Sequence, residues 1–217
     1  MDAKRIIPML KVSQGRVADA PEGTALAWAR RLELAGADGI LFIEDPAGGD
    51  RAWIREVAGA LFIPFAVAVA GSGAEDLAEI RAAGADLVVL AAPPADLPEL
   101  AARFGRQALG LAVDLAWTTD GWRTASGQEA MAALVELGQR GAGELLLTLD
   151  AGAQPGLDRL GEGLASLAMP VLVQTDSWEL GREALLQGAD GLAYPATLGT
   201  PQDCKSFLQG GGLTLRH

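Results

Sequence analysis

Two charged residues, Lys11 and Asp114, stand near the ends of the apolar runs at residues 6–10 and 108–113. If both runs are strands of one barrel, the two side chains face each other across its mouth. An ammonium and a carboxylate placed in this way can transfer a proton, and an amine with a lowered pKa can attack a carbonyl group. The alternative is a salt bridge that neutralises the mouth and carries no chemistry. The sequence leaves these interpretations open.

Two further acidic residues follow apolar runs. Glu44 ends the run at residues 39–44, where its carboxylate either contacts a ligand or keeps the start of a loop solvated. Asp176 lies between the run at 170–174 and a helical pattern, so it either caps that helix or contacts a ligand. Because the carboxyl ends of parallel strands meet at one edge of a sheet, a small-molecule site is expected at that edge.

The composition excludes several kinds of chemistry and of partner. His217 is the only histidine and Cys204 the only cysteine, so we expect no His-based metal site, no Ser-His-Asp triad, no disulfide and no cofactor. A formal net charge of −11 argues against nucleic acid and anionic membranes as partners. No apolar stretch reaches the roughly 20 residues that a membrane span needs. Since no basic and apolar leader precedes the first strand, we expect a cytoplasmic protein.

A short phrase recurs four times and divides the chain into two similar halves. Each copy begins with Gly-Ala, closes a helical pattern and opens an apolar run. The first and third copies start 105 residues apart, and the second and fourth 104 apart, which indicates an internal repeat. The four copies are Gly36–Gly39, Gly84–Leu87, Gly141–Glu144 and Gly188–Gly191.

The hydrophobic pattern predicts eight alternations of strand and helix within one domain, residues 1–217. An α/β chain of this kind forms a parallel sheet, and two fourfold halves favour closure into a (β/α)8 TIM barrel made of two similar half-barrels. We expect strands near 5–12, 39–44, 64–70, 86–91, 108–114, 144–149, 170–174 and 190–194. We expect helices near 22–35, 50–60, 74–83, 95–104, 127–140, 156–167, 177–187 and 201–209.

Several segments, in order along the chain, carry a resemblance to a known family. They read AKRIIPMLKVSQGRV at residues 3–17, FIPF at 62–65, RFGRQA at 103–108, VD at 113–114 and GAGELLLT at 141–148. The chain resembles the HisF family, the cyclase subunit of imidazole glycerol phosphate synthase in histidine biosynthesis. The resemblance implies a (β/α)8 barrel, a substrate with a phosphate at each end, and ammonia delivered by a glutaminase partner on the opposite face.

The resemblance also assigns two catalytic aspartates, at the ends of the first and fifth strands. Asp114 matches the second of them, whereas Lys11 stands at the position of the first. Replacing a carboxylate with an ammonium reverses the charge and removes a group that can accept a proton at neutral pH. A standard cyclase activity is therefore not expected from these residues, unless other groups compensate.

The family's phosphate-binding loops are also altered. After the third strand two glycines survive in Gly71-Ser72-Gly73, which can hold one anion through backbone N–H groups or form a plain turn. The loop after the sixth strand keeps Gly152, and the loop after the seventh has Asp176, which would repel a phosphate. The loop after the fourth strand contains Pro93-Pro94, which lacks N–H donors.

On the opposite face, the family places charged residues around a gate at the bottom of the barrel. Arg5 and Glu144 match two of them, while Gly39 and Leu87 stand where charged residues would be. Arg5 and Glu144 are interpreted either as an inherited ion pair or as a working gate. Near the mouth, Trp117, Trp122 and Trp178 form an aromatic lid or docking patch if they cluster, or else simply pack over the barrel mouth.

Three hypotheses follow. The first is a divergent HisF-like barrel that lacks the standard cyclisation and binds a phosphorylated or other small molecule, or a protein. The second is a working lyase-type cyclase that uses Asp114 as its acid–base residue. The third is an interaction subunit that joins a glutaminase-type partner or a second copy of itself.

Overall fold

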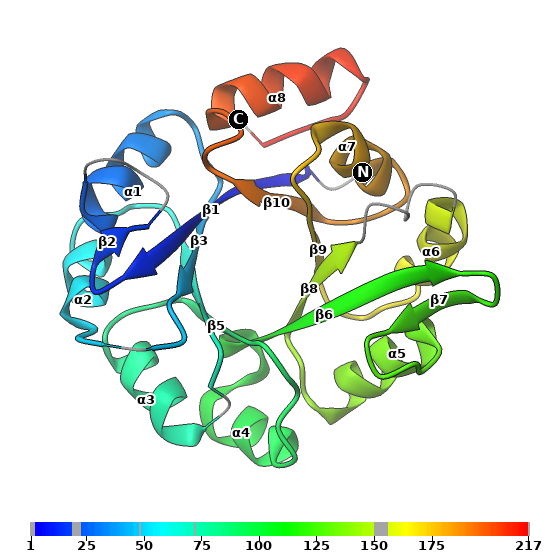
Figure 1. Cartoon of the computed structure of the whole chain (residues 1–217), viewed down its shortest axis with the longest axis horizontal. Helices are drawn as coiled ribbons and strands as arrows, with labels where there is room; N and C mark the ends of the chain where they lie inside the picture. Colours follow the sequence, from blue (N-terminus) through cyan, green and yellow to red (C-terminus); the bar gives the residue numbers. More distant parts are fainter. Residues whose placement is uncertain (1–2, 19–22, 48, 72, 150–155, 217) are drawn as a thin grey trace.

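Eight parallel strands form a closed barrel in the computed structural model, which describes residues 3–18, 23–47, 49–71, 73–149 and 156–216 (Figure 1). Neighbouring strands pair in parallel all round, and the last strand pairs with the first, from Arg5 opposite Gly191 to Met9 opposite Pro195. The predicted (β/α)8 barrel is therefore confirmed. In order around the barrel the strands are β1 (Arg5–Ser13), β3 (Ile40–Glu44), β4 (Phe65–Val69), β5 (Leu87–Leu90), β6 (Leu109–Thr118), β8 (Glu144–Leu149), β9 (Val171–Gln174) and β10 (Gly191–Pro195).

Helices alternate with these strands and cover the outside of the barrel (Figure 1). Their observed bounds lie inside the predicted ranges or within one residue of them. They are α1 (Ala25–Leu34), α2 (Ala52–Ala58), α3 (Ala74–Ala82), α4 (Leu97–Phe104), α5 (Ala130–Arg140), α6 (Leu157–Leu164), α7 (Trp178–Leu186) and α8 (Pro201–Gly210), with a short 3₁₀ helix η1 (Arg106–Ala108) before β6.

The core has two layers, because successive residues of a strand point to opposite faces. The outer layer lies between strands and helices and contains the larger buried side chains, such as Phe42, Ile54 and Tyr194. The inner layer fills the middle of the barrel. It consists of Ile7, Met9, Leu41, Val89, Leu146, Leu172 and Ala193, with small alanines packed against it.

At the amino ends of the strands, three copies of the recurring phrase lock neighbouring strands together. In each copy the aspartate donates its backbone N–H to the carbonyl of a residue at the start of the preceding strand. Its carboxylate accepts the N–H of that same residue, at 2.8–2.9 Å. We call these three arrangements the aspartate clamps: Asp38 on Ile6, Asp86 on Phe65, and Asp190 on Val171.

The remaining copy of the phrase has Gly143 in place of the aspartate, and packing explains why. A Cβ atom at Gly143 would lie only 1.9 Å from the Arg106 carbonyl oxygen. The Gly143 N–H still donates to the Leu109 carbonyl, at 2.9 Å, so the backbone half of the clamp is retained. The side-chain half is lost, and the next residue, Glu144, becomes available for another partner.

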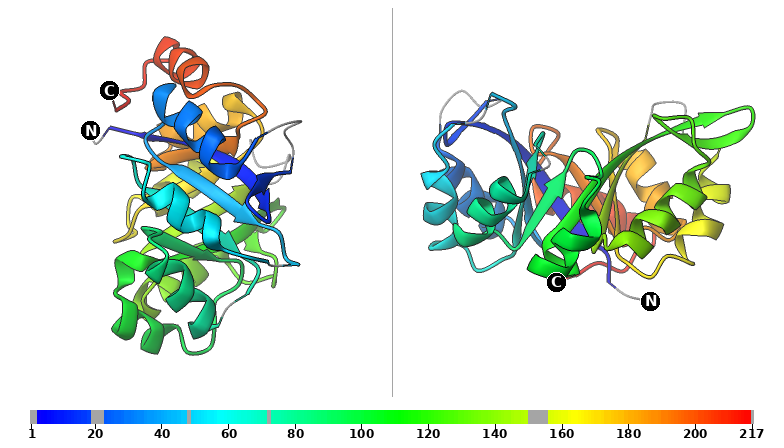
Figure 2. Two further views of the ribbon diagram at one scale, coloured as in Figure 1. Left: turned by 90° about the vertical axis from the view of Figure 1, so that its left-hand side faces the viewer. Right: turned by 90° about the horizontal axis from the view of Figure 1, so that it is seen from below.

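Two short antiparallel hairpins extend the strands beyond the carboxyl end of the barrel. In the first, β2 (Arg16–Val17) folds back on the end of β1. In the second, β6 continues to Thr118 and pairs with β7 (Gly121–Thr124), and the pair projects outward (Figure 2). The segment that looked least regular in the sequence is therefore an ordered hairpin whose outer strand was not predicted.

Side chains cap the N-termini of four of the eight barrel helices, namely α1, α5, α7 and α8. The Ser177 hydroxyl accepts the Leu180 N–H, which confirms the predicted start of α7 and shows that Asp176, directly before it, is not the cap. Asp96 stands at the start of α4, but its carboxylate makes no capping hydrogen bond. Thr200 and Asp203 form a reciprocal capping box at α8.

Candidate functional site

Lys11 and Asp114 lie on opposite sides of the barrel mouth. In β1, Lys11 follows Ile7 and Met9 at intervals of two residues and therefore faces the barrel axis with them. In β6, Asp114 follows Ala112 in the same way. Both residues are exposed, and the ion pairs between described residues do not include one that joins them. The strands thus bring an ammonium and a carboxylate to one opening from opposite walls.

Glu44, the ligand candidate at the end of β3, is engaged by an arginine that the sequence did not single out. Arg51, just before α2, binds both carboxylate oxygens of Glu44 through Nε and Nη2, at 2.8 and 2.7 Å. The Arg51 and Glu44 side chains are only 12% and 9% exposed. The hydrogen bonds to Glu44 raise the pKa of Arg51 further above its usual range. Glu44 therefore works as a structural anchor in this arrangement.

Arg51 also holds Asp76 close to the glycine loop after β4. Arg51 Nη1 donates to Asp76 Oδ1 and to Glu79 Oε2, both at 2.8 Å. The other Asp76 oxygen sits over Gly71, where an added Cβ atom would be only 2.6 Å from it. Gly71 and Gly73 are exposed, and Ser72 lies outside the described residues. A carboxylate thus occupies the space beside the loop in which the family resemblance places a phosphate.

The loop candidates on the other half of the mouth are also unfavourable to anions. Asp176 is exposed in the loop after β9. At the start of α8, Asp203 accepts hydrogen bonds from the hydroxyl and the backbone N–H of Thr200, and these bonds lower the pKa of its carboxyl group. A carboxylate at a helix N-terminus neutralises the local positive field of the backbone. Gly152 lies outside the described residues.

The three tryptophans near the mouth do not form one cluster. Trp117 and Trp122 contact each other in the β6–β7 hairpin, with ring centroids 5.5 Å apart, and the Trp122 indole N–H donates to the Gly156 carbonyl at 2.7 Å. Trp178 packs instead against Tyr194 and Phe207, between β10 and α8. The expected alternative of packing over the barrel ends fits these contacts better than a shared aromatic lid.

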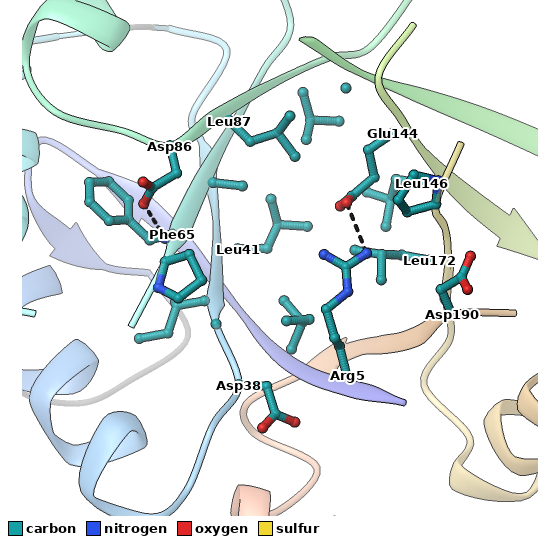
Figure 3. A pocket seen from close by; sticks show the side chains of 18 of the residues that line it. Arg5, Asp38, Leu41, Phe65, Asp86, Leu87, Glu144, Leu146, Leu172 and Asp190 are labelled. Atoms are coloured by element: carbon teal, nitrogen blue, oxygen red, sulfur yellow. Dashed lines mark hydrogen bonds and ion pairs between the residues drawn. The ribbon is translucent and has the colours of Figure 1, made fainter. Parts of the chain in front are cut away.

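A cavity of about 750 Å³ opens at the other end of the barrel, among the amino ends of the strands (Figure 3). Arg5 from β1 and Glu144 from β8 form an ion pair inside it, with Arg5 Nη2 at 2.8 Å from Glu144 Oε2. Gly39 and Leu87 line the same cavity. Residues that the resemblance places around a gate are thus found together, two of them charged and paired.

The amino-end rim also exposes two large apolar side chains. Phe62, in the loop before β4, is 98% exposed, and Leu34, at the end of α1, is 88% exposed. The Glu33 carboxylate accepts the N–H groups of Phe62 and Ile63, at 2.7 and 3.2 Å, and so ties this loop to the end of α1. The exposure of Phe62 could not be predicted from the sequence, because a loop residue leaves no periodic signal.

Two further features concern metal binding and membrane-spanning helices. Among the described residues, no group of three or more His, Cys, Asp or Glu side chains is arranged to hold a metal ion. Within the same part of the chain, no helix combines the length and the apolar character required to cross a bilayer.

A family model and a curated relative both match this chain. The family model described as "Histidine biosynthesis protein" matches residues 5–159. A curated protein, imidazole glycerol phosphate synthase subunit HisF from Leifsonia xyli subsp. xyli (strain CTCB07), is 32% identical over 250 residues, which cover 99% of this chain and 98% of the relative. The similarity thus extends over almost the whole length of both chains.

Proposed function

Since the chain belongs to the histidine biosynthesis protein family of HisF-like barrels, we propose that it is a divergent member that does not catalyse the bisphosphate cyclisation of the family. The observation that carries the proposal is at the mouth, where Lys11 faces the axis from the wall opposite Asp114. One carboxylate is left where the family chemistry uses two. An ammonium cannot take the place of a general base unless its pKa is strongly depressed.

The phosphate loops support the same proposal. A bisphosphate needs two clusters of free N–H donors at the mouth, usually at helix N-termini. Asp76 occupies the space beside Gly71, and Asp203 caps α8. Each carboxylate would face a phosphate with like charge, so the substrate would lose binding energy at both ends. Binding and proton transfer are weakened independently of each other.

The test is a turnover assay with the bisphosphate substrate and ammonium, with the Leifsonia xyli HisF subunit as the positive control. We expect turnover at least about 10²-fold below the control, which is the low end of what general acid–base catalysis contributes. The variant Lys11→Asp, alone and combined with Asp76→Ser, should recover part of the activity. Turnover by the unaltered chain comparable with that of the control would overturn the proposal and favour a rearranged cyclase with Asp114 as its acid–base residue.

A role as a subunit is the second candidate, and the exposed apolar rim favours it. Phe62 and Leu34 lie at the amino end, on the face where the family resemblance places a glutaminase partner. Exposed aromatic side chains of this kind are typical of binding surfaces. Sedimentation velocity with and without a glutaminase-type subunit should show a complex that Phe62→Ser weakens. A chain that sediments as a monomer in both experiments would exclude both this partner and a homo-oligomer.

We further propose that residues 1–217 form one domain, that the barrel derives from two half-barrels, and that the protein resides in the cytoplasm. The matching Asp86 and Asp190 clamps, one in each half, support the duplication. Cys204 is buried as a free thiol, which suits a reducing compartment.

A further inference from the structure

The amino-end cavity has the size and the lining of a small-molecule site. Its volume of about 750 Å³ falls in the range of ligand pockets in general, and apolar side chains form its floor. These side chains belong to the inner layer of the barrel, and Leu41, Leu87, Leu146 and Leu172 can be followed around the cavity in Figure 3. They are Ile7, Leu41, Leu87, Val89, Leu146 and Leu172.

The ion pair in this cavity uses only part of the hydrogen-bonding capacity of its two side chains. A single hydrogen bond joins Arg5 Nη2 to Glu144 Oε2, whereas a bidentate pair would use two. Among the described residues, Arg5 Nε and Nη1 and Glu144 Oε1 have no side-chain hydrogen-bond partner. The two side chains are 22% and 14% exposed, so a ligand in the cavity can reach them. Donors and an acceptor therefore lie side by side above an apolar floor.

The other charged groups that line the cavity bind partners within the chain or belong to its C-terminal segment. Asp38 binds the Lys205 ammonium, at 2.9 Å, as well as the Ile6 N–H. Asp86 and Asp190 each hold a backbone N–H in their clamps. Arg216 belongs to the C-terminal segment at the edge of the cavity. Arg5 and Glu144 are thus the pair that can orient a ligand relative to the floor.

We propose that this cavity binds a free α-amino acid with a large apolar side chain. The ligand carboxylate takes the open donors of Arg5, its ammonium takes the open oxygen of Glu144, and its side chain lies on the leucine floor. A zwitterion presents both charges on groups attached to the same carbon and so matches both members of the ion pair. A carboxylate or an amine alone would match one member and face the like charge of the other. The site is distinct from the mouth and does not rest on the proposed function.

The first experiment measures binding of L-phenylalanine to the full chain by isothermal titration calorimetry. Phenethylamine, 3-phenylpropionate and N-acetyl-L-phenylalanine serve as comparison ligands, since each lacks one of the zwitterion's two charges. We expect saturable binding of phenylalanine and at least about tenfold weaker binding of all three comparison ligands, as the loss of a charged hydrogen bond predicts. Equal affinity for phenylalanine and phenethylamine, or no binding of either, would overturn the proposal.

Variants locate the site. Glu144→Gln removes the charge that holds the ammonium, and Leu87→Trp fills part of the cavity from β5, a strand that carries neither member of the ion pair. Both should lower the affinity at least about tenfold. The control is Glu136→Gln, whose side chain is 57% exposed on α5, and it should leave the affinity unchanged. Circular dichroism confirms that each variant is folded. Undiminished binding by folded Leu87→Trp would place the ligand elsewhere and refute the proposal.

Discussion

The two ends of this barrel are closed in different ways. At the carboxyl end, side chains make the connections. Arg51 binds three carboxylates, Ser177 caps α7, and Asp203 belongs to the capping box of α8. At the amino end, the aspartate clamps join backbone to backbone, and the centre is left open. Ligand sites of such barrels normally lie at the carboxyl end. Here carboxylates lie beside loops of that end in which the family resemblance places phosphates, and the cavity described above lies at the other end.

The charged residues of the mouth and the contacts that align the strands thus lie at different ends of this barrel. The clamps depend on residues at the starts of strands, far from Lys11 and Asp114. Lys11 and Asp114 can therefore change without disturbing the clamps. The stabilities of three substituted chains test whether the two ends are independent of each other.

The largest effect is expected at the amino end, for Asp38→Asn. Asp38 and Lys205 are 7% and 10% exposed, so the substitution leaves a buried ammonium without its counter-ion. We expect the free energy of unfolding to fall by about 3–5 kcal/mol, measured by urea denaturation. The control is Asp86→Asn, which loses a clamp carboxylate without a cationic partner and should cost about 1–2 kcal/mol. Equal losses would mean that the clamp, and not the ion pair, sets the cost.

A smaller loss is expected at the mouth, for Arg51→Met. The Glu44 carboxylate would then remain buried without a partner, while Asp76 and Glu79 could turn to solvent. We expect a loss of about 2–3 kcal/mol, below the Asp38 value because water reaches part of the cluster. Arg55→Met, at an exposed position of α2, is the matched control. A loss larger than that of Asp38→Asn would reverse the order of the two ends.

The smallest effect concerns the helix cap at α8 and depends on pH. The pKa of Asp203 is lowered by its bonds to Thr200, so its contribution to stability is present above the unfolded-state pKa and is lost as pH falls through the folded-state value. The chain should therefore be more stable than Asp203→Asn at neutral pH, and the difference should vanish under acidic conditions. Thermal unfolding of both proteins across this pH interval measures the difference. A difference that grows on acidification contradicts the capping role.

Most of the fold was accessible from the sequence, because burial on both faces makes the strands continuous apolar runs and Gly-Ala phrases end the helices. The site was less accessible. Positions such as Lys11 and Asp114 follow from strand alternation, but the Arg51 contacts to Asp76 and Glu79 join segments 25 and 28 residues apart. Surface loops decide such contacts, and their geometry leaves no period in the sequence. The β6–β7 hairpin was missed for a similar reason: its strand continues beyond the buried run.

The aspartate clamps have a consequence for engineering. They fix the register between strands at the end of the barrel that carries no catalytic loops, so the loops of the opposite end contribute little to deciding which strand pairs with which. Segments after β4, β6 or β9 can then be exchanged for loops of other lengths with the barrel kept in its alignment. This chain should accept grafted loops as a scaffold, provided that Asp38, Asp86 and Asp190 are retained.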